Sequence, residues 1–254
     1  MDGTIMVNKI NDFWRNSPLN TVEELDGLQL FAEPLVGVAA AGDPLFSALQ
    51  AENAVGPQHL TPEQWLGGAQ SVISYFLPFS ATVREANRGA GLPAKEWLYG
   101  RIEGEVFNKA LAKFLAEWLQ EQGYDAVIPA ADSRFKVVER RSNWSERHVA
   151  YVAGLGTLSL NCSLITKKGS AGRLGSVVTN AHLLPTPRDY GAVDAYCNRC
   201  GACIRRCPPL AIHETGKDHA VCAGYLDRVM ERFKPRYGCG KCQTGVPCEA
   251  KIPE

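Results

Sequence analysis

The cysteines are the residues of this sequence whose type and spacing point most directly to chemistry. Eight of the nine lie in the last quarter of the 254-residue chain. The first four form a Cys-x2-Cys-x2-Cys-x3-Cys-Pro run that ends at Cys207-Pro208. Three cysteines at intervals of three can hold three corners of one 4Fe–4S cube, while the fourth is carried to a neighbouring cluster. Two cubes need eight thiolates, so the spacing predicts a pair of clusters.

The same crossing rule divides the cysteines into two ligand sets. The first cluster is expected to take Cys197, Cys200, Cys203 and Cys248. The second is expected to take Cys207, Cys222, Cys239 and Cys242. The last four cysteines depart from the symmetric ferredoxin pattern, because Gln-Thr-Gly-Val-Pro separates Cys242 from Cys248. The placement of Cys222 and Cys248 therefore depends less directly on the spacing.

Two other uses of clustered cysteines compete with this interpretation. A disulfide framework suits a small secreted chain with an even number of cysteines, whereas this chain is long and has nine. Zinc would accept eight thiolates in two tetrahedral sites, and Cys-x2-Cys pairs are common in zinc sites. The three-step run that ends in Cys-Pro is much less typical of zinc, so iron–sulfur clusters are favoured.

Length, charge and composition limit the possible domain organisation and partners of the chain. Its length allows one large domain, expected over residues 1–190, and a small cluster domain over 191–254. Lys plus Arg equals Asp plus Glu at 27 each, so no net basic field draws in nucleic acid. No apolar run approaches the roughly 20 residues of a membrane helix. The first residues lack the layout of an export signal, and a reducing cytoplasm is expected.

Elements that could position a site alternate along the first 190 residues. Expected helices cover 7–16, a segment that begins at Asp43-Pro44, a segment after the capping box of Thr61 and Gln64, and 100–123. Expected strands cover 35–41, 71–77, 126–128 and 175–180. One face of the longest helix should carry Val106, Phe107, Ala110, Phe114, Leu115, Trp118 and Leu119. This alternation predicts an α/β sheet covered by helices.

A second informative stretch runs from Arg140 to Ile165. Ser145 or Asn143 can cap a helix over 146–153, and residues 158–165 alternate in part. Gly154 and Gly156 would let the backbone turn sharply and approach something large. Taken alone, Gly-Leu-Gly-Thr is more often a helix stop and a turn. The full dinucleotide-binding fingerprint is absent, so a Rossmann site is not predicted.

Several short motifs together resemble the cofactor-binding core of the epoxyqueuosine reductase family, over roughly residues 65–250. They are Tyr99-Gly-Arg101, Ala153-Gly-Leu-Gly-Thr157, Leu164-Ile165, Gly169-Ser170, Leu174-Gly175 and Thr179, in order before the double-cluster module. The resemblance implies an α/β (α+β) core of nitroreductase-like type followed by a bacterial-ferredoxin-like domain. It also implies a cobalamin without an axial protein ligand, which lies between the two parts and receives electrons from the clusters. Corrinoid reductive dehalogenases share this architecture.

If the resemblance carries over, residues 154–165 would line the corrin ring or its tail. The implied cofactor-binding residues are Gly154, Leu155, Gly156, Thr157, Ser159, Cys162, Ser163, Leu164 and Ile165. Cys162, the ninth cysteine, is more often a buried small apolar residue than a nucleophile. Two features depart from the family. Its proton-donating aspartate aligns here with about Arg140, and its C-terminal helical-repeat domain, which helps to hold tRNA, has no counterpart before Glu254.

These departures shape the expected function. We do not expect a nucleic acid substrate, and a small or anionic molecule is favoured instead. Candidate proton donors or substrate clamps are Arg140, Arg141, His148 and Tyr99, each of which could equally be a surface charge or a satisfied structural residue. An arginine stays protonated, so it stabilises an anion better than it donates a proton.

The leading hypothesis is an iron–sulfur oxidoreductase that delivers electrons through two 4Fe–4S clusters to a bound cobalamin. Its partner would be a low-potential electron donor of ferredoxin or flavodoxin type, and a second copy of the chain could cover the cluster face. The alternative is an electron-transfer protein without its own substrate, which reduces a partner corrinoid or redox enzyme. A third interpretation is a core that binds flavin or nothing at all.

Overall fold

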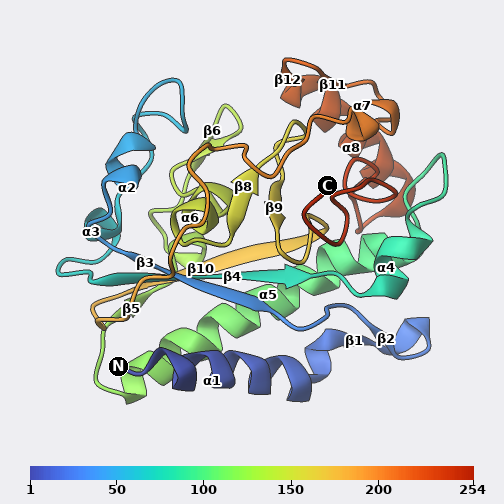
Figure 1. Cartoon of the computed structure of the whole chain (residues 1–254). Helices are drawn as coiled ribbons and strands as arrows, with labels where there is room; N and C mark the ends of the chain where they lie inside the picture. The colour runs from blue at the N-terminus through green and yellow to red at the C-terminus, as the bar shows by residue number, and fades with distance from the viewer.

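The computed structural model describes all 254 residues and has a four-stranded sheet at its centre (Figure 1). The strands are β3 (Leu35–Ala40), β4 (Ser71–Pro78), β5 (Ala126–Val127) and β10 (Gly172–Thr179). Their order is β3-β4-β10-β5, and every neighbouring pair is antiparallel. All eight residues of β4 are buried, as its unbroken apolar run predicted. The fold is thus a mixed α/β fold, although its sheet is antiparallel.

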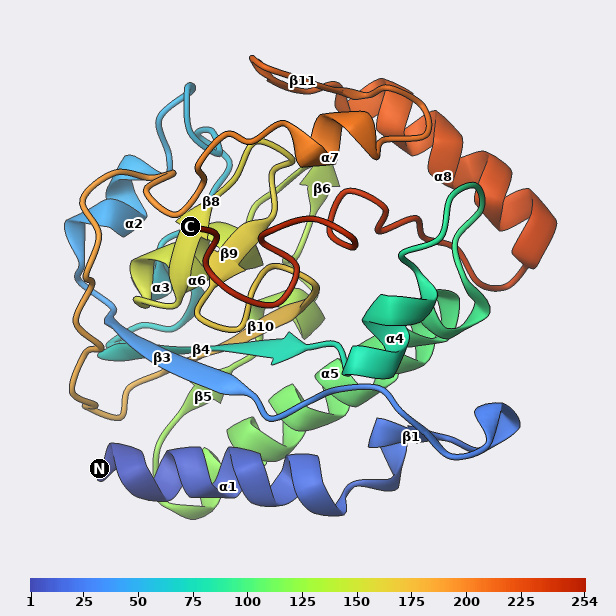
Figure 2. The ribbon, with the colours of Figure 1, turned by 45° about the vertical axis from the view of Figure 1, so that its right-hand side comes forward.

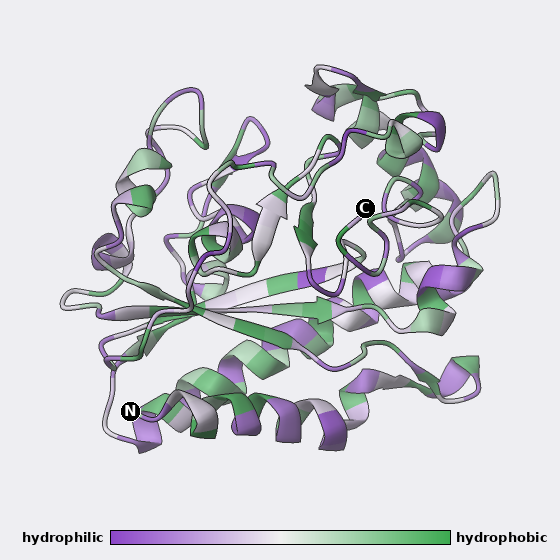
Figure 3. Cartoon of the chain, viewed as in Figure 1, coloured by the Kyte–Doolittle hydropathy of each residue, from purple (hydrophilic) through white to green (hydrophobic).

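One face of the sheet is covered by α1 (Gly3–Asn16) and α5 (Lys95–Glu121), as Figures 1 and 2 show. Asp2 caps α1 by accepting a hydrogen bond from the Thr4 N–H. In Figure 3 hydrophobic and hydrophilic residues alternate along α1, which is the pattern of a helix with one buried face. The expected buried face of α5 needs one correction. Val106 is 52% exposed, because the inward positions fall at Phe107 and Leu111.

The opposite face carries shorter elements. They are α2 (Pro44–Ala48), α3 (Pro62–Trp65), α6 (Glu146–Val152), β8 (Gly156–Leu158) and β9 (Leu164–Thr166). Two of the expected caps are present, because Asp43 accepts from the Leu45 N–H and the Thr61 capping box forms with Gln64. Ser145 precedes α6 as expected, but its side chain makes no capping hydrogen bond to a backbone N–H. The partly alternating segment 158–165 is the turn and second half of the β8–β9 hairpin. Residues of α6 and β9 face the cysteine-rich segment across a cavity.

Smaller elements complete the chain. They are the 3-10 helices Pro18–Asn20, Glu23–Leu25 and Pro129–Ala131, the strands β1 (Thr21–Val22), β2 (Leu28–Gln29), β6 (Val137–Val138), β7 (Arg141–Ser142), β11 (Ile212–His213) and β12 (Gly216–Lys217), and the helices α4 (Ala81–Ala86), α7 (Ala202–Arg205) and α8 (His219–Phe233). No helix combines the length and the hydrophobicity that a membrane span requires.

The cysteine-rich segment lies on the same side of the sheet as α6 and β9 (Figure 2), and Glu249, near the end of the chain, pairs with Arg84 of α4. The backbone N–H groups of Ser170 and Ala171 donate to the carbonyls of Cys248 and Glu249. The Asn87 side chain, which is fully buried, donates to the Cys239 carbonyl at 2.9 Å. These bonds fix the position of the last cysteines relative to the sheet.

Candidate functional site

The structure brings the eight cysteines of the last quarter together as two separate groups. Cys207, Cys222, Cys239 and Cys242 line a large cavity. Cys197, Cys200, Cys203 and Cys248 line a second, much smaller one. These are the two sets that the crossing rule predicted, including the placement of Cys222 and Cys248. Their role as cluster ligands stays a prediction.

The thiols within each group affect one another. Burial, and then the charges of Cys248, Cys197 and Cys200, raise the pKa of Cys203 to about 11. Burial raises the pKa of Cys242 to about 12, where Lys217 opposes the rise and the other three cysteines of its group add to it. Thiols held this close repel each other as thiolates, so they need a positively charged centre to be ionised together.

Local backbone chemistry places these cysteines. Gly201 adopts φ 69° before α7, which turns the first run around a common centre. Asp218 caps α8 by accepting from the Ala220 and Val221 N–H groups, and Cys222 then falls in the first turn of the helix. The Ala211 N–H donates to Cys207 Sγ at 3.2 Å, a type of bond that tunes cluster potentials.

The donor chemistry of each group fits a 4Fe–4S cluster, because each group offers four thiols. No three His, Cys, Asp or Glu side chains converge closely enough to hold a single metal ion. The two groups also differ in access. Cys200 is exposed, whereas Cys207 is buried against Ala211 and Ile212.

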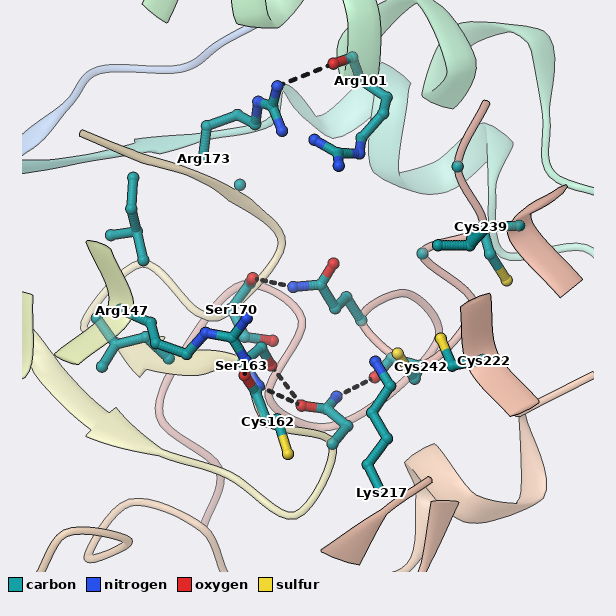
Figure 4. Close-up of a pocket in the computed structure, with 18 of the residues that line it drawn as sticks. Arg101, Arg147, Cys162, Ser163, Ser170, Arg173, Lys217, Cys222, Cys239 and Cys242 are labelled. Atoms are coloured by element: carbon teal, nitrogen blue, oxygen red, sulfur yellow. Dashed lines mark hydrogen bonds between the residues drawn. The ribbon is translucent and has the colours of Figure 1, made fainter. Parts of the chain in front are cut away.

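The large cavity has a volume of about 710 Å³ and lies between the sheet and the second cysteine group. Antiparallel pairing places Arg173 and Leu174, at the start of β10, beside Leu77 and Phe76, near the end of β4. Phe79 and Trp97 continue this apolar wall. Figure 4 shows Cys222, Cys239 and Cys242 on one side of the cavity and Arg147 and Arg173 on the other.

Four cationic side chains line the cavity, namely Arg101, Arg147, Arg173 and Lys217. The Arg147 guanidinium donates to the Cys162 carbonyl at 2.5 Å, and Arg173 donates to the Arg101 carbonyl at 3.0 Å and pairs with Glu105. Burial opposes the charge of Lys217, but the nearby Cys242 and Cys222 raise its pKa above the usual value. The cavity therefore favours a ligand with negative charge.

Glu146 is the acidic residue that lines the same cavity. Its Oε2 is covered from solvent and has no hydrogen-bond partner, and no cation forms an ion pair with it. Burial raises the pKa of this carboxyl to about 7, a hydrogen bond from Ser176 lowers it in part, and the charge of Glu105 adds to the rise. A carboxyl with this pKa is protonated in part near neutral pH.

The chemistry of the cavity suits part of a large flat cofactor such as cobalamin. Its volume lies within the roughly 300–1,000 Å³ of clefts that bind cofactors and other small molecules. Aromatic and aliphatic side chains can pack against a flat macrocycle. Two buried polar atoms in its wall, Glu146 Oε2 and Arg173 Nε, have no partner within the chain. Both atoms are covered by the chain itself, so a ligand in the cavity does not reach them as they stand.

The residues expected to bind the corrin separate into three groups. Cys162, Ser163 and Leu164 line the large cavity. Ser159 and Ile165 line the smaller one, beside the first cysteine group. Gly154, Leu155, Gly156 and Thr157 line neither.

The two glycines of this motif approach the chain itself. A Cβ at Gly156 would lie 1.9 Å from the Ile165 carbonyl oxygen. A Cβ at Gly154 would meet Thr186 at 3.1 Å, in a conformation with φ 80°. Close approach is thus required, as the sequence suggested, but the groups approached are Thr186 and the Ile165 backbone of the chain itself. Thr157 Oγ1 accepts from the Tyr196 N–H and so ties the hairpin to the cysteine-rich segment.

None of the four catalytic candidates lines the large cavity. Arg140 occupies the β6–β7 turn at φ 63°, and Arg141 donates to the carbonyls of Glu52 and Val55. Burial, followed by the charges of Arg147 and His59, lowers the pKa of His148 to about 4, so that it is neutral at pH 7. The Arg236 guanidinium covers the ring of Tyr99 at 3.6 Å. The structure thus gives these four residues no contact with the cavity.

Most residues of the cavity wall were not among the residues that the sequence predicted for a site. Arg101 was part of a motif, Tyr99-Gly-Arg101, whereas Glu146 and Arg147 were expected only as the first residues of a helix over 146–153. No sequence pattern pointed to Arg173 or Lys217, because they reach the cavity from elements that are far apart in the sequence. A search for charged residues next to apolar ends of strands would have found Arg173.

The chain resembles known proteins in sequence and in fold. No family model matches the chain. An epoxyqueuosine reductase of Bacillus anthracis is 28% identical over 204 residues, which cover 73% of this chain and 50% of the relative. One of Leadbetterella byssophila is 28% identical over 207 residues, with 75% and 62% covered. The chain spans about half to three fifths of the length of these curated relatives.

Solved structures share the fold. An epoxyqueuosine reductase from Streptococcus thermophilus matches with a TM-score of 0.56 and 18% identity, over 97% of this chain and 66% of that one. A catabolic reductive dehalogenase matches with a TM-score of 0.59 and 17% identity, over 86% and 30%. The chain is therefore similar in sequence to epoxyqueuosine reductases, which are oxidoreductases, and has the fold that they share with reductive dehalogenases.

Proposed function

We propose that this chain is an iron–sulfur oxidoreductase that passes electrons through two 4Fe–4S clusters to a cobalamin in the large cavity. The observation that carries the proposal is that Cys207, Cys222, Cys239 and Cys242 line the same cavity as the aromatic wall of the sheet. One of the dehalogenases with this fold, at a TM-score of 0.59, was described as suggesting a mechanism for B12-dependent dehalogenation. When bound, cobalamin would supply the low-potential reducing chemistry of cobalt.

The two cysteine groups suggest a direction for electron flow. The first group contains the exposed Cys200, so a low-potential donor of ferredoxin or flavodoxin type would reach it from solvent. The second group faces the cavity. Electrons would therefore enter at the first cluster and leave from the second, one at a time.

The chain's own residues would hold the substrate and exclude water. Phe76, Phe79 and Trp97 form a buried apolar layer beneath the cavity, and a dry cavity strengthens each electrostatic contact within it. The guanidinium groups of Arg101 and Arg147 and the Lys217 ammonium would bind and orient negative charge on the substrate. We therefore propose a small anionic substrate.

A second candidate substrate is a modified tRNA nucleotide. One epoxyqueuosine reductase with this fold, at a TM-score of 0.54 and 17% identity, was solved with an epoxyqueuosine-modified tRNA-Tyr stem loop. That finding conflicts with our expectation that nucleic acid is not a partner. Binding of such a stem loop to the cluster-loaded chain, compared with the unmodified stem loop, decides between them. Selective binding of the modified form would replace the small anion, and equal weak binding would retain it.

The electron-carrier alternative makes a different prediction for the cavity. Anaerobic purification with added hydroxocobalamin, followed by metal analysis and absorption spectroscopy, separates the two functions. The reductase should retain one cobalt beside about eight irons per chain. Eight irons without cobalt would favour the carrier, and two zinc ions in place of iron would contradict both functions.

A further inference from the structure

We infer that Lys217 raises the reduction potential of the second cluster by holding a positive charge against the thiols of Cys222 and Cys242. The inference rests on the proposed function and adds to it the residue that decides where an electron rests within the chain. Lys217 lines the large cavity together with the second cysteine group. Figure 4 shows its amino group directed toward Cys242.

A short hairpin places Lys217 on the side of these thiols. β11 and β12 pair antiparallel, with Ile212 directly opposite Lys217. Side chains of directly opposite residues lie on the same face of an antiparallel pair. Ile212 is buried and packs with Cys207, and Cys222 and Cys242 pack against the same cluster. The Lys217 side chain therefore leaves the hairpin on the face that carries the second cysteine group.

The backbone of Ala211 fixes both ends of this arrangement. Its N–H donates to Cys207 Sγ at 3.2 Å, and its carbonyl accepts from the Asp218 N–H at 2.8 Å. Asp218 follows Lys217 directly and caps α8, whose first turn carries Cys222. One residue thus links the lysine to two of the four thiols.

The charge of Lys217 acts on thiols, whereas Arg173, another cation of the cavity, pairs with Glu105. Burial opposes the charge of Lys217, and the groups that raise its pKa are thiols, first Cys242 and then Cys222. Reduction adds negative charge to a cluster, so a cation beside it stabilises the reduced form. Net charge and hydrogen bonds to sulfur are among the factors that set cluster potentials.

Burial acts on the second cluster in the opposite sense. This group includes the buried Cys207, whereas the first group contains the exposed Cys200. Burial disfavours added charge and would lower the potential of the second cluster. Arg199 adds positive charge near the first group, but it is 63% exposed and pairs with Asp194 at 2.7 Å, so its effect is weakened. Lys217 therefore offsets the burial of the second cluster.

The Lys217 charge would direct electrons toward the cavity. One electron that the low-potential donor delivers to the first group would come to rest on the second, because Lys217 stabilises negative charge there. Only an electron moves, and no bond forms or breaks. The electron is then held beside the cavity.

The test measures cluster potentials in the absence of substrate. The chain is purified anaerobically, its iron content is measured, and its clusters are titrated with Ti(III) citrate while their EPR signals are recorded. The second cluster is the one whose signal Cys242→Ala removes. Lys217→Gln should lower its potential so that, at the wild-type midpoint, the ratio of reduced to oxidised cluster falls at least tenfold, a shift of about 59 mV for one electron.

Two variants serve as controls. Lys217→Arg keeps the charge and should keep the potential of the second cluster close to that of the wild type. Lys113→Gln removes a charge from α5, where the lysine is 72% exposed, and should leave both potentials unchanged. Lys217→Met removes the same charge as Lys217→Gln, and it supplies the measurement if the glutamine variant does not retain the second cluster.

An unchanged second potential without the Lys217 charge, an equal shift in Lys113→Gln, or a shift confined to the first cluster would overturn the inference. A lysine that only bound the substrate would give the first of these results, because no substrate is present. Wild-type protein without iron would instead overturn the proposed function, and the iron analysis distinguishes that outcome from an unchanged potential.

Discussion

At the scale of single residues, the cysteines allow the most direct prediction. Cys203→Ala and Cys242→Ala each remove one ligand from a different group, so each should lower the iron content from about eight to about four per chain. Cys162→Ala is the matched control, because Cys162 lies outside the cysteine-rich segment that supplies both groups, although it lines the large cavity, and it should retain all the iron. Anaerobic iron analysis measures the result. Loss of iron from Cys162→Ala alone would mean that the ligand sets are assigned wrongly.

Glu146 makes a prediction about stability. Its pKa is raised from 4.5 to about 7, so between these values the folded chain holds a proton that the unfolded chain has lost. Stability conferred by this group is therefore present at low pH, falls as pH rises through that window, and is lost above pH 7. Glu146→Gln should gain about 3 kcal/mol relative to the wild type between pH 4.5 and pH 8. Thermal unfolding across this range tests it, and a parallel response of both proteins would contradict it.

At the scale of elements, the start of α6 depends on a neutral histidine. The Ser145 N–H donates to His59 Nε2 at 3.3 Å, and the His59 ring stacks on Trp144. Burial lowers the pKa of His59 to about 4. The unfolded chain therefore takes up a proton first as pH falls below 6.5, and stability should decrease from pH 6.5 to 4. A protonated ring also has no acceptor for Ser145.

His59→Gln tests this dependence. The substitution should lower stability at pH 7, because it removes the stacked ring, and should weaken the decrease between pH 6.5 and 4. His213→Gln changes an exposed histidine on β11 and serves as the control. If His59→Gln and the control lose stability with acid equally, α6 does not depend on this ring.

The sequence predicted helices and strands better than it predicted the cavity. The capping residues Asp43 and Thr61 and the apolar run of β4 act locally, and each produced its element within a few residues. The cavity depends on contacts between segments distant in the sequence, which no local pattern records. Gly156 illustrates the limit: glycine indicated a close approach, but only the fold shows that the neighbour is the Ile165 carbonyl.

At the scale of the whole molecule, one buried carboxylate links the end of the cysteine-rich segment to α4. Glu249 accepts hydrogen bonds from Arg84, Arg88 and the Gly245 N–H. Burial alone would raise its pKa, but the bonds from Arg88 and Gly245 lower it below the usual value. Because Cys248 precedes it, the position of the fourth thiol of the first group depends on this contact.

Glu249→Gln should therefore affect both stability and iron. Removing the charge leaves Arg84 without its ionic partner, and should cost about 2 kcal/mol, less than a fully buried pair because Arg88 is half exposed. The first cluster should become labile, so that iron falls toward four per chain on dilution while the second cluster persists. Glu254→Gln, whose carboxylate is 94% exposed and pairs with Lys251, should change neither quantity. Equal iron retention by both variants would show that the first cluster is held without this contact between the C-terminal segment and α4.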